Sequence, residues 1–160
     1  MTNSAQRKVK VENHAFMQQI TRQFRENDCK SVTFVVYGYS MHPFLHSGRD
    51  KVVLTPPEPP RIGQVVLAEI EPKRYALHRI IKIEGETITM QGDGNPLWMT
   101  EQFTADKIIG TASAFIRKGR KISTQSRTWR YYSAFWHATR PLRRVLLSIY
   151  RRITGKRYKV

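Results

Sequence analysis

Hydrophobic residues in the first forty positions recur with two different periods. Between residues 12 and 26, Phe16, Ile20 and Phe24 follow one another at intervals of four, which places them on one face of a helix. Residues 31–39 (SVTFVVYGY) are rich in β-branched and aromatic side chains and contain Gly38 near their end, as expected for a strand that enters a turn. The pattern therefore predicts an N-terminal helical segment at residues 1–30, followed by the first strand of a sheet.

Five further segments have the composition of short strands. They cover residues 51–55, 64–70, 75–83, 87–91 and 107–116, and Gly, Pro, Asn and Asp cluster in the segments between them. No helical pattern separates one predicted strand from the next. We therefore expect a mainly β fold, a coiled antiparallel β-domain that spans residues 31–121.

The sequence after residue 121 has a different texture. Trp129, Tyr132, Phe135 and Trp136 fall at helical spacing, and a second helical stripe of aliphatic residues begins after Pro141. Arginines interrupt both stripes too often for either to cross a bilayer. Residues 122–160 are predicted to form a basic, aromatic helical segment, here called the basic tail.

The net charge of +16 lies almost entirely in the C-terminal third. Residues 1–106 hold 13 lysines and arginines against all 12 acidic residues, whereas residues 107–160 hold the other 15 basic residues and no acid. Basic helices with aromatic and aliphatic side chains favour the surface of an anionic membrane, which is the partner we expect for the basic tail. A docking helix for another protein is the main alternative. Nucleic acid is disfavoured, because no base-reading motif is present.

Cysteine and histidine usage limits the chemistry of the chain. The single cysteine, Cys29, excludes an internal disulfide, and no cluster of cysteines and histidines has the spacing of a zinc site. We therefore expect no metal and no other cofactor. The first 34 residues contain no apolar stretch long enough for a secretory signal or a membrane span, so the expected location is cytoplasmic, with a peripheral place at the inner face of the membrane where the basic tail binds lipid.

Three residues in separate motifs suggest nucleophilic catalysis. Ser40 follows the first predicted strand within residues 38–43 (GYSMHP), His78 lies inside a later strand, and Asp93 lies in the Gly-Asp-Gly-Asn turn after the next strand. A serine hydroxyl attacks a carbonyl carbon when a nearby base accepts its proton, and a histidine with an ordinary pKa of about 6.5 is largely neutral at pH 7 and able to do so. A carboxylate can then hold the imidazole in the productive tautomer. The pattern predicts Ser40 as nucleophile, His78 as general base and Asp93 as the third member.

These motifs resemble those of the signal peptidase I superfamily, which also includes the self-cleaving LexA-type repressors. Ser40-Met41, with proline two positions further on, is similar to the family's Ser-Met signature. His78-Arg79 resembles the form of the family in which histidine replaces lysine as the base, and residues 92–95 are similar to its Gly-Asp-Asn-Asn motif. Order, spacing and strand context agree from about residue 32 to residue 120.

The resemblance implies a serine endopeptidase that cleaves an exported or precursor peptide lying as an extended strand along a sheet edge. It also implies that Gly38, Tyr39 and Met41 line the oxyanion hole or the substrate groove. Because position 38 carries no hydroxyl, the oxyanion hole would depend largely on the backbone N–H of Ser40. A LexA-type autoprotease is one alternative, although the chain has neither the Ala-Gly nor the Cys-Gly bond at which such proteins cut. The other is a catalytically inactive β-domain that binds a peptide or protein partner.

Overall fold

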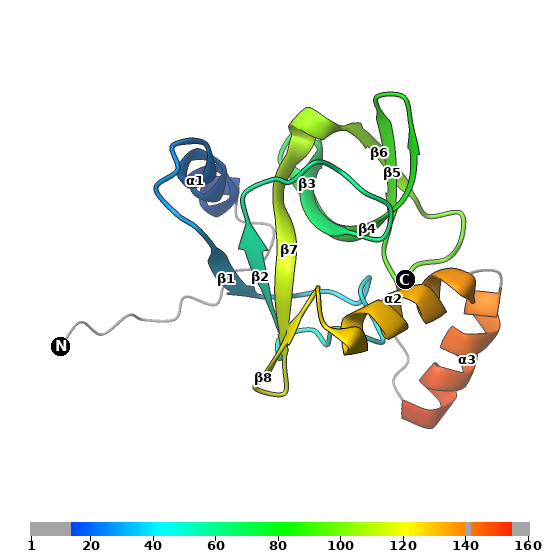
Figure 1. The fold of residues 1–160 in the computed structure, drawn as a ribbon. Helices are drawn as coiled ribbons and strands as arrows, with labels where there is room; N and C mark the ends of the chain where they lie inside the picture. Colours follow the sequence, from blue (N-terminus) through cyan, green and yellow to red (C-terminus); the bar gives the residue numbers. More distant parts are fainter. Residues whose placement is uncertain (1–13, 140–141, 155–160) are drawn as a thin grey trace.

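The computed structural model describes residues 14–139 and 142–154 (Figure 1). In chain order the elements are α1 (His14–Arg25), β1 (Val32–Val35), β2 (Lys51–Thr55), β3 (Val65–Glu71), β4 (Arg74–Glu84), β5 (Thr87–Gln91), β6 (Glu101–Thr104), the 3₁₀ turn η1 (Ala105–Lys107), β7 (Ile108–Arg117), β8 (Arg120–Ser123), α2 (Arg127–Ala138) and α3 (Arg143–Thr154).

The strands form one antiparallel sheet in the order β1-β2-β7-β3-β4-β5-β6, with β8 paired to the second half of β7. The sheet coils, so that β3, β4, β5 and β6 curl away from β2 and the lower half of β7 (Figure 1). The prediction of a mainly β, antiparallel fold is therefore confirmed.

All six predicted strands are present, with ends shifted by a few residues, but β6 and β8 were not predicted. Both are four residues long, and the only apolar side chain in each is Phe103 or Ile122. Their pairing depends on a neighbouring strand and, for β8, on a tight turn at Lys118 and Gly119, both of which have positive φ. Period and composition do not carry that information.

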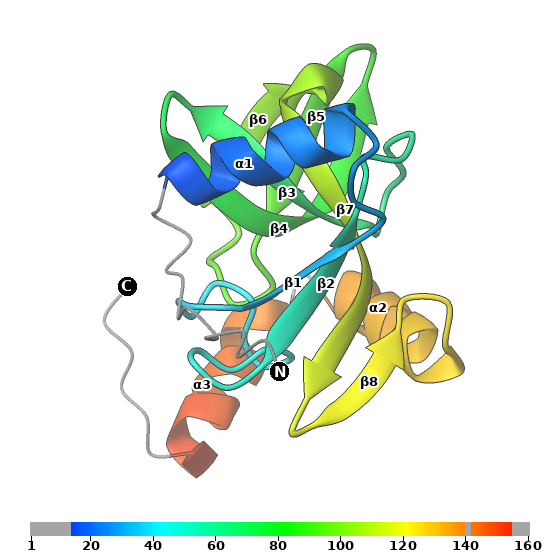
Figure 2. The ribbon, with the colours of Figure 1, turned by 90° about the vertical axis from the view of Figure 1, so that its left-hand side faces the viewer.

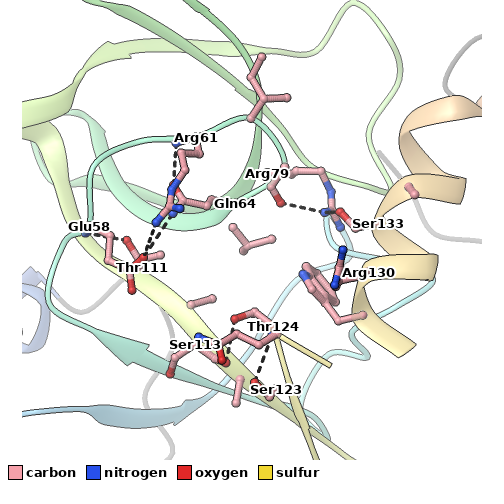
Figure 3. Close-up of a pocket in the computed structure, with 18 of the residues that line it drawn as sticks. Glu58, Arg61, Gln64, Arg79, Thr111, Ser113, Ser123, Thr124, Arg130 and Ser133 are labelled. Carbon is pink, nitrogen blue, oxygen red and sulfur yellow. Dashed lines mark hydrogen bonds and ion pairs between the residues drawn. The ribbon is translucent and has the colours of Figure 1, made fainter. Parts of the chain in front are cut away.

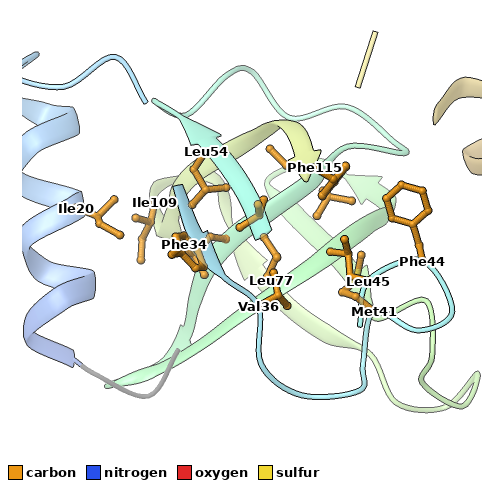
Figure 4. Close-up of a cluster of buried hydrophobic side chains, with 14 of the residues drawn as sticks. Ile20, Phe34, Val36, Met41, Phe44, Leu45, Leu54, Leu77, Ile109 and Phe115 are labelled. Carbon is orange, nitrogen blue, oxygen red and sulfur yellow. The ribbon is translucent and has the colours of Figure 1, made fainter. Parts of the chain in front are cut away.

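Helix α1 crosses the sheet at the opposite end of the molecule from α2 and α3 (Figure 2). Its buried residues are Met17, Ile20 and Phe24, which join a core that also contains Phe34, Leu54, Leu77, Ile109 and Phe115 (Figure 4). The predicted helix at residues 12–26 is confirmed within the described residues, although Phe16 is only partly buried and packs edge-on against Phe34.

The first half of the basic tail packs into this core. Trp129 of α2 lies in the same cluster as Phe44 and Phe115, with ring centroids 4.9 Å and 4.5 Å away. Trp136 is also buried. Two of the aromatic residues that the sequence suggested for lipid, Trp129 and Trp136, are therefore turned inward on α2, whereas Phe135 is exposed. Of the helices that the structure describes, none has the length and apolar character needed to cross a membrane.

Residues 36–50, which carry Ser40, form a loop closed by backbone hydrogen bonds. Val36 N–H donates to Asp50 O at 2.9 Å, and Gly48 N–H donates to Val36 O at 2.8 Å. The fully buried Asp50 carboxylate accepts two hydrogen bonds from Arg49, at 2.7 Å and 2.8 Å, and one from His46 N–H at 2.9 Å. Burial alone would raise the pKa of Asp50, but these hydrogen bonds outweigh it and hold the pKa below its ordinary value.

Asp50 should make the stability of the protein depend on pH in the acid range. Because its folded pKa is depressed, its contribution is complete above the unfolded value of about 3.9 and is lost as the pH falls through the folded pKa. Asp50→Asn should cost about 2 kcal/mol of unfolding free energy at neutral pH, through lost charge-assisted hydrogen bonds. Urea unfolding between about pH 6 and pH 3 should show the difference between wild type and variant shrinking toward the acid end. A constant difference over this range would contradict the assignment.

Candidate functional site

Ser40 lies in a tight turn within this loop. His42 N–H donates to Tyr39 O at 3.0 Å, and Ser40 O accepts from Gly94 N–H at 2.7 Å. Gly38 enters the turn with a φ of 98°, a conformation that glycine adopts without strain. Met41 is buried in the core and anchors the turn, whereas the side chain of Ser40 is half-buried at the surface.

The Ser40 turn rests directly on the turn formed by residues 92–95. A Cβ at Gly92 would lie 2.5 Å from Ser40 O and 2.9 Å from Ser40 Cβ, and one at Gly94 would lie 2.6 Å from Tyr39 O. Side chains do not tolerate such distances to backbone atoms, so both positions require glycine. Two motifs separated by about fifty residues in sequence are thus in contact, and the contact depends on the absence of side chains.

His78 lies in β4 on the side of the sheet that faces Ser40. Arg79 pairs with Gln91 of β5, so the next step of the same register sets Gly92 opposite His78. Residues opposite one another in an antiparallel pair project from the same face of the sheet. A side chain at Gly92 would point at Ser40. Ser40 therefore lies over the face of the sheet from which His78 projects.

A carboxylate holds the imidazole of His78. His78 Nδ1 is 2.9 Å from Glu101 Oε2, and the two side chains are only 7% and 11% exposed. Glu101 reaches this point from β6, where it pairs with Met90 of β5. When Nδ1 donates to a carboxylate, Nε2 carries the lone pair of the neutral ring, as a general base requires. Within the described residues, Nε2 of His78 has no hydrogen-bond partner.

Asp93 has other partners than the predicted imidazole. Arg79 Nε donates to Asp93 Oδ1 at 2.9 Å, Arg79 Nη2 donates to Oδ2 at 2.8 Å, and the Tyr132 hydroxyl donates to Oδ2 at 3.1 Å. The physical reason is strand alternation. Arg79 follows His78 in β4 and therefore points to the opposite face, where it binds the Asp93 carboxylate. The place predicted for Asp93 beside the imidazole belongs to Glu101.

Glu101 was not predicted as a site residue, because the sequence of β6 does not mark it as a strand. The available signal was its position ten residues after Gln91, close enough to return as a hairpin beside β5. Such a hairpin would have placed Glu101 on the strand beside β5, as an alternative to Asp93 for the carboxylate beside His78.

Arg79 and Asp93 form a buried ion pair, and the charge of Asp93 affects the pKa values of Arg79 and Tyr132. Burial alone would lower the pKa of Arg79, but the Asp93 carboxylate outweighs it and keeps the pKa above its ordinary value, so the guanidinium remains charged. Burial, reinforced by the charge of Asp93, raises the pKa of Tyr132 well above its ordinary value, so its hydroxyl stays protonated and donates. The Arg79 guanidinium also lies 4.8 Å from the ring centroid of Trp129.

Asp93 ties the turn at residues 92–95 to α2. Trp136 Nε1 donates to Asp93 O at 3.1 Å, and Ser133 Oγ accepts from Arg79 Nη1 at 2.6 Å. Since Ser40 rests on this turn, helix α2 supports the Ser40 turn from the far side of the sheet.

A separate groove of about 1010 Å³ opens beside the Arg79 guanidinium, between α2, β8, β7 and the loop before β3 (Figure 3). Its wall carries the exposed cationic side chains of Arg61, Lys121 and Arg130, and Arg61 is paired with Glu58 at 3.4 Å. Among the described residues that line the groove, Ser40, His78 and Glu101 do not appear. The groove therefore belongs to the opposite side of β4 from the candidate site.

The residues predicted for the oxyanion hole differ in availability. Gly38 N–H donates to Ser47 Oγ at 3.1 Å and is therefore engaged. Tyr39 is 49% exposed beside the turn. The N–H groups of Ser40 and Met41 have no acceptor within residues 14–139 and 142–154. This arrangement suits the stabilisation of an oxyanion at Ser40.

Comparison of the chain with protein-family models, with curated proteins and with solved structures finds no match.

Asp93 should matter mainly for stability. Removing one partner of a buried ion pair leaves the other charge uncompensated, so Asp93→Ala should lower the unfolding free energy by about 3–5 kcal/mol. Glu84→Ala, which breaks the exposed contact between Glu84 and Lys82, is the matched control and should change it by less than about 0.5 kcal/mol. Chemical unfolding of both variants measures the contrast, and equal effects would refute the structural role of Asp93.

Proposed function

We propose that this protein is a serine peptidase in which Ser40 is the nucleophile, His78 the general base and Glu101 the residue that positions the imidazole. The observation that carries the proposal is the hydrogen bond between His78 Nδ1 and Glu101, made on the face where Ser40 rests against Gly92. The motifs around Ser40 and His78, which resemble those of the signal peptidase I superfamily, support the same function, and with it a β-domain of the signal peptidase and LexA kind.

In the proposed reaction, Ser40 Oγ attacks the carbonyl carbon of the scissile peptide bond while its proton passes to His78 Nε2. The N–H groups of Ser40 and Met41 stabilise the oxyanion, and Glu101 stabilises the imidazolium. His78 then gives the proton to the departing amine, which leaves an acyl-enzyme. A water molecule then attacks the ester while it transfers a proton to His78, and His78 passes this proton to Ser40 Oγ as the acyl group leaves as a carboxylic acid.

The substrate is proposed to bind as an extended strand beside β1. This strand leads into the Ser40 loop and lies at the end of the strand order, with β2 as its neighbour in the described sheet. An added strand would satisfy the outer backbone groups of β1 and place a peptide carbonyl near Ser40. An exported or precursor peptide with small residues at the cut is the substrate class that the resemblance implies.

Covalent labelling tests the nucleophile directly. A fluorophosphonate should modify the folded wild-type protein at Ser40, Ser40→Ala should not be labelled, and His78→Ala should react roughly a hundredfold to ten-thousandfold more slowly, since a general base contributes that much. Ser148→Ala, which removes an exposed hydroxyl from α3, is the matched control and should label like wild type. Mass spectrometry of the labelled peptide identifies the site. Labelling that survives in Ser40→Ala would contradict Ser40 as the nucleophile, and no labelling of wild type would favour the inactive, partner-binding alternative.

Glu101→Gln tests the positioning role. The amide of glutamine can donate to Nδ1 of His78, which favours the tautomer whose Nε2 carries the proton and cannot accept one. Labelling of Ser40 should therefore slow by roughly a hundredfold or more, with the fold unchanged. Glu86→Gln, an exposed substitution in the β4–β5 turn, should leave the rate unaltered. An unchanged rate in Glu101→Gln would remove Glu101 from the mechanism while leaving Ser40 and His78 in it.

A further inference from the structure

Helix α3 carries an apolar stripe that faces away from the rest of the molecule. Leu142, just before the helix, and Val145, Ile149 and Ile153 within it are 60%, 56%, 49% and 79% exposed. Their spacing of three, four and four residues places them along one side of a helix. Single exposed apolar residues are common on proteins, but a continuous row of them marks an interaction surface.

The opposite side of α3 is already occupied. Leu147 is buried, and the Tyr150 ring lies 6.3 Å from the ring of His42, with Tyr150 Oη 3.5 Å from His46 Nε2. The inner face of α3 therefore packs against residues 42–46, directly after Ser40. Because the core contacts of α3 are made by other residues, the outer stripe is not buried against the part of the chain that the structure describes.

The basic charge of the C-terminal third indicates which kind of partner the stripe would bind. Residues 107–160 contain 15 lysines and arginines and no acidic residue, and Arg152 is exposed beside the stripe. A short helix with aliphatic residues on one side and only basic charged residues in its sequence has the composition of a helix that lies in the plane of an anionic membrane. We propose that α3 is such an interfacial helix and that its outer stripe, Leu142, Val145, Ile149 and Ile153, inserts into an anionic lipid surface.

This surface differs from the one that the sequence suggested. Trp129 and Trp136 are 5% and 4% exposed and therefore cannot contribute to insertion. On α2, Tyr131 and Phe135 are 74% and 54% exposed. They can add to the lipid contact only on the exposed side of that helix. The aliphatic side chains of the α3 stripe carry the insertion.

Membrane docking through α3 has a consequence for the candidate site. Since the inner face of α3 packs on residues 42–46, a bilayer bound to its outer face comes within one helix diameter, about 10 Å, of the loop that carries Ser40. This step rests on the proposed peptidase function: the substrates would be peptide segments held at a lipid surface.

Vesicle sedimentation of the full chain tests the docking. Vesicles of phosphatidylcholine with about 30% phosphatidylglycerol should bind the protein at least about tenfold more strongly than pure phosphatidylcholine vesicles. Val145→Ser/Ile149→Ser should weaken binding to the anionic vesicles by about tenfold or more. Ile62→Ser/Trp98→Ser, which removes two exposed apolar residues elsewhere, is the matched control and should bind like wild type. Thermal melting of both double variants confirms that the fold is kept.

Three outcomes would overturn the proposal: equal binding to anionic and neutral vesicles, equal binding of wild type and the α3 double variant, or tight binding to duplex DNA at physiological salt with no binding to vesicles. Loss of a dimer in the α3 double variant, without vesicle binding by wild type, would assign the stripe to a second copy instead. Ser40→Ala should bind vesicles like wild type, and the α3 double variant should keep its fluorophosphonate labelling in solution. Failure of the docking and failure of the peptidase function are therefore distinguishable.

Discussion

The buried ion pair between Arg79 and Asp93 joins three parts of the molecule that are far apart in sequence. Arg79 belongs to β4 and Asp93 to the turn after β5. Tyr132 and Trp136 of α2 both donate hydrogen bonds to Asp93. A charge pair this deep is stable only when every partner is in place, because each unpaired charge would carry a large desolvation cost. The turn on which Ser40 rests is therefore held by the same contacts that dock α2.

Because side chains alternate along a strand, His78 and Arg79 of β4 lie in two different environments. His78 and Arg79 are neighbours in sequence, yet they project from opposite faces of the sheet. One face carries Arg79 with its structural carboxylate and the cationic groove, and the other carries His78 with Glu101 and the Ser40 turn. A shift of one residue in the register of β4 would exchange these environments, so the pairings of β4 with β3 and β5 determine which residue lies on the same side of the sheet as the Ser40 turn.

The two C-terminal helices divide their tasks in a similar way. Helix α2 uses Trp129 and Trp136 to complete the core, whereas α3 buries Leu147 among its described side chains and leaves an aliphatic row outside. Within its described residues, the basic tail is thus a packed helix followed by a helix with an exposed aliphatic face, and α3 contacts residues 42–46 of the loop that carries Ser40.

Local sequence determined much of this architecture. The helix at α1, six of the strands and the two helices after residue 121 follow from period and composition, and the glycines at 92 and 94 mark the place where two turns meet. Ser40 and His78 could be nominated because each lies in a recognisable motif.

The partner of each charged group was decided only by the tertiary structure. Asp93 lies in a motif and Glu101 does not, but a carboxylate pairs with whichever cation or imidazole shares its face of the sheet. That face depends on strand pairing and on short strands such as β6, whose own sequence carries little signal. The inward turn of Trp129 has the same cause: a helix with apolar residues on several sides buries the side that matches the shape and charge of its neighbours, here the Arg79 guanidinium and the ring of Phe115.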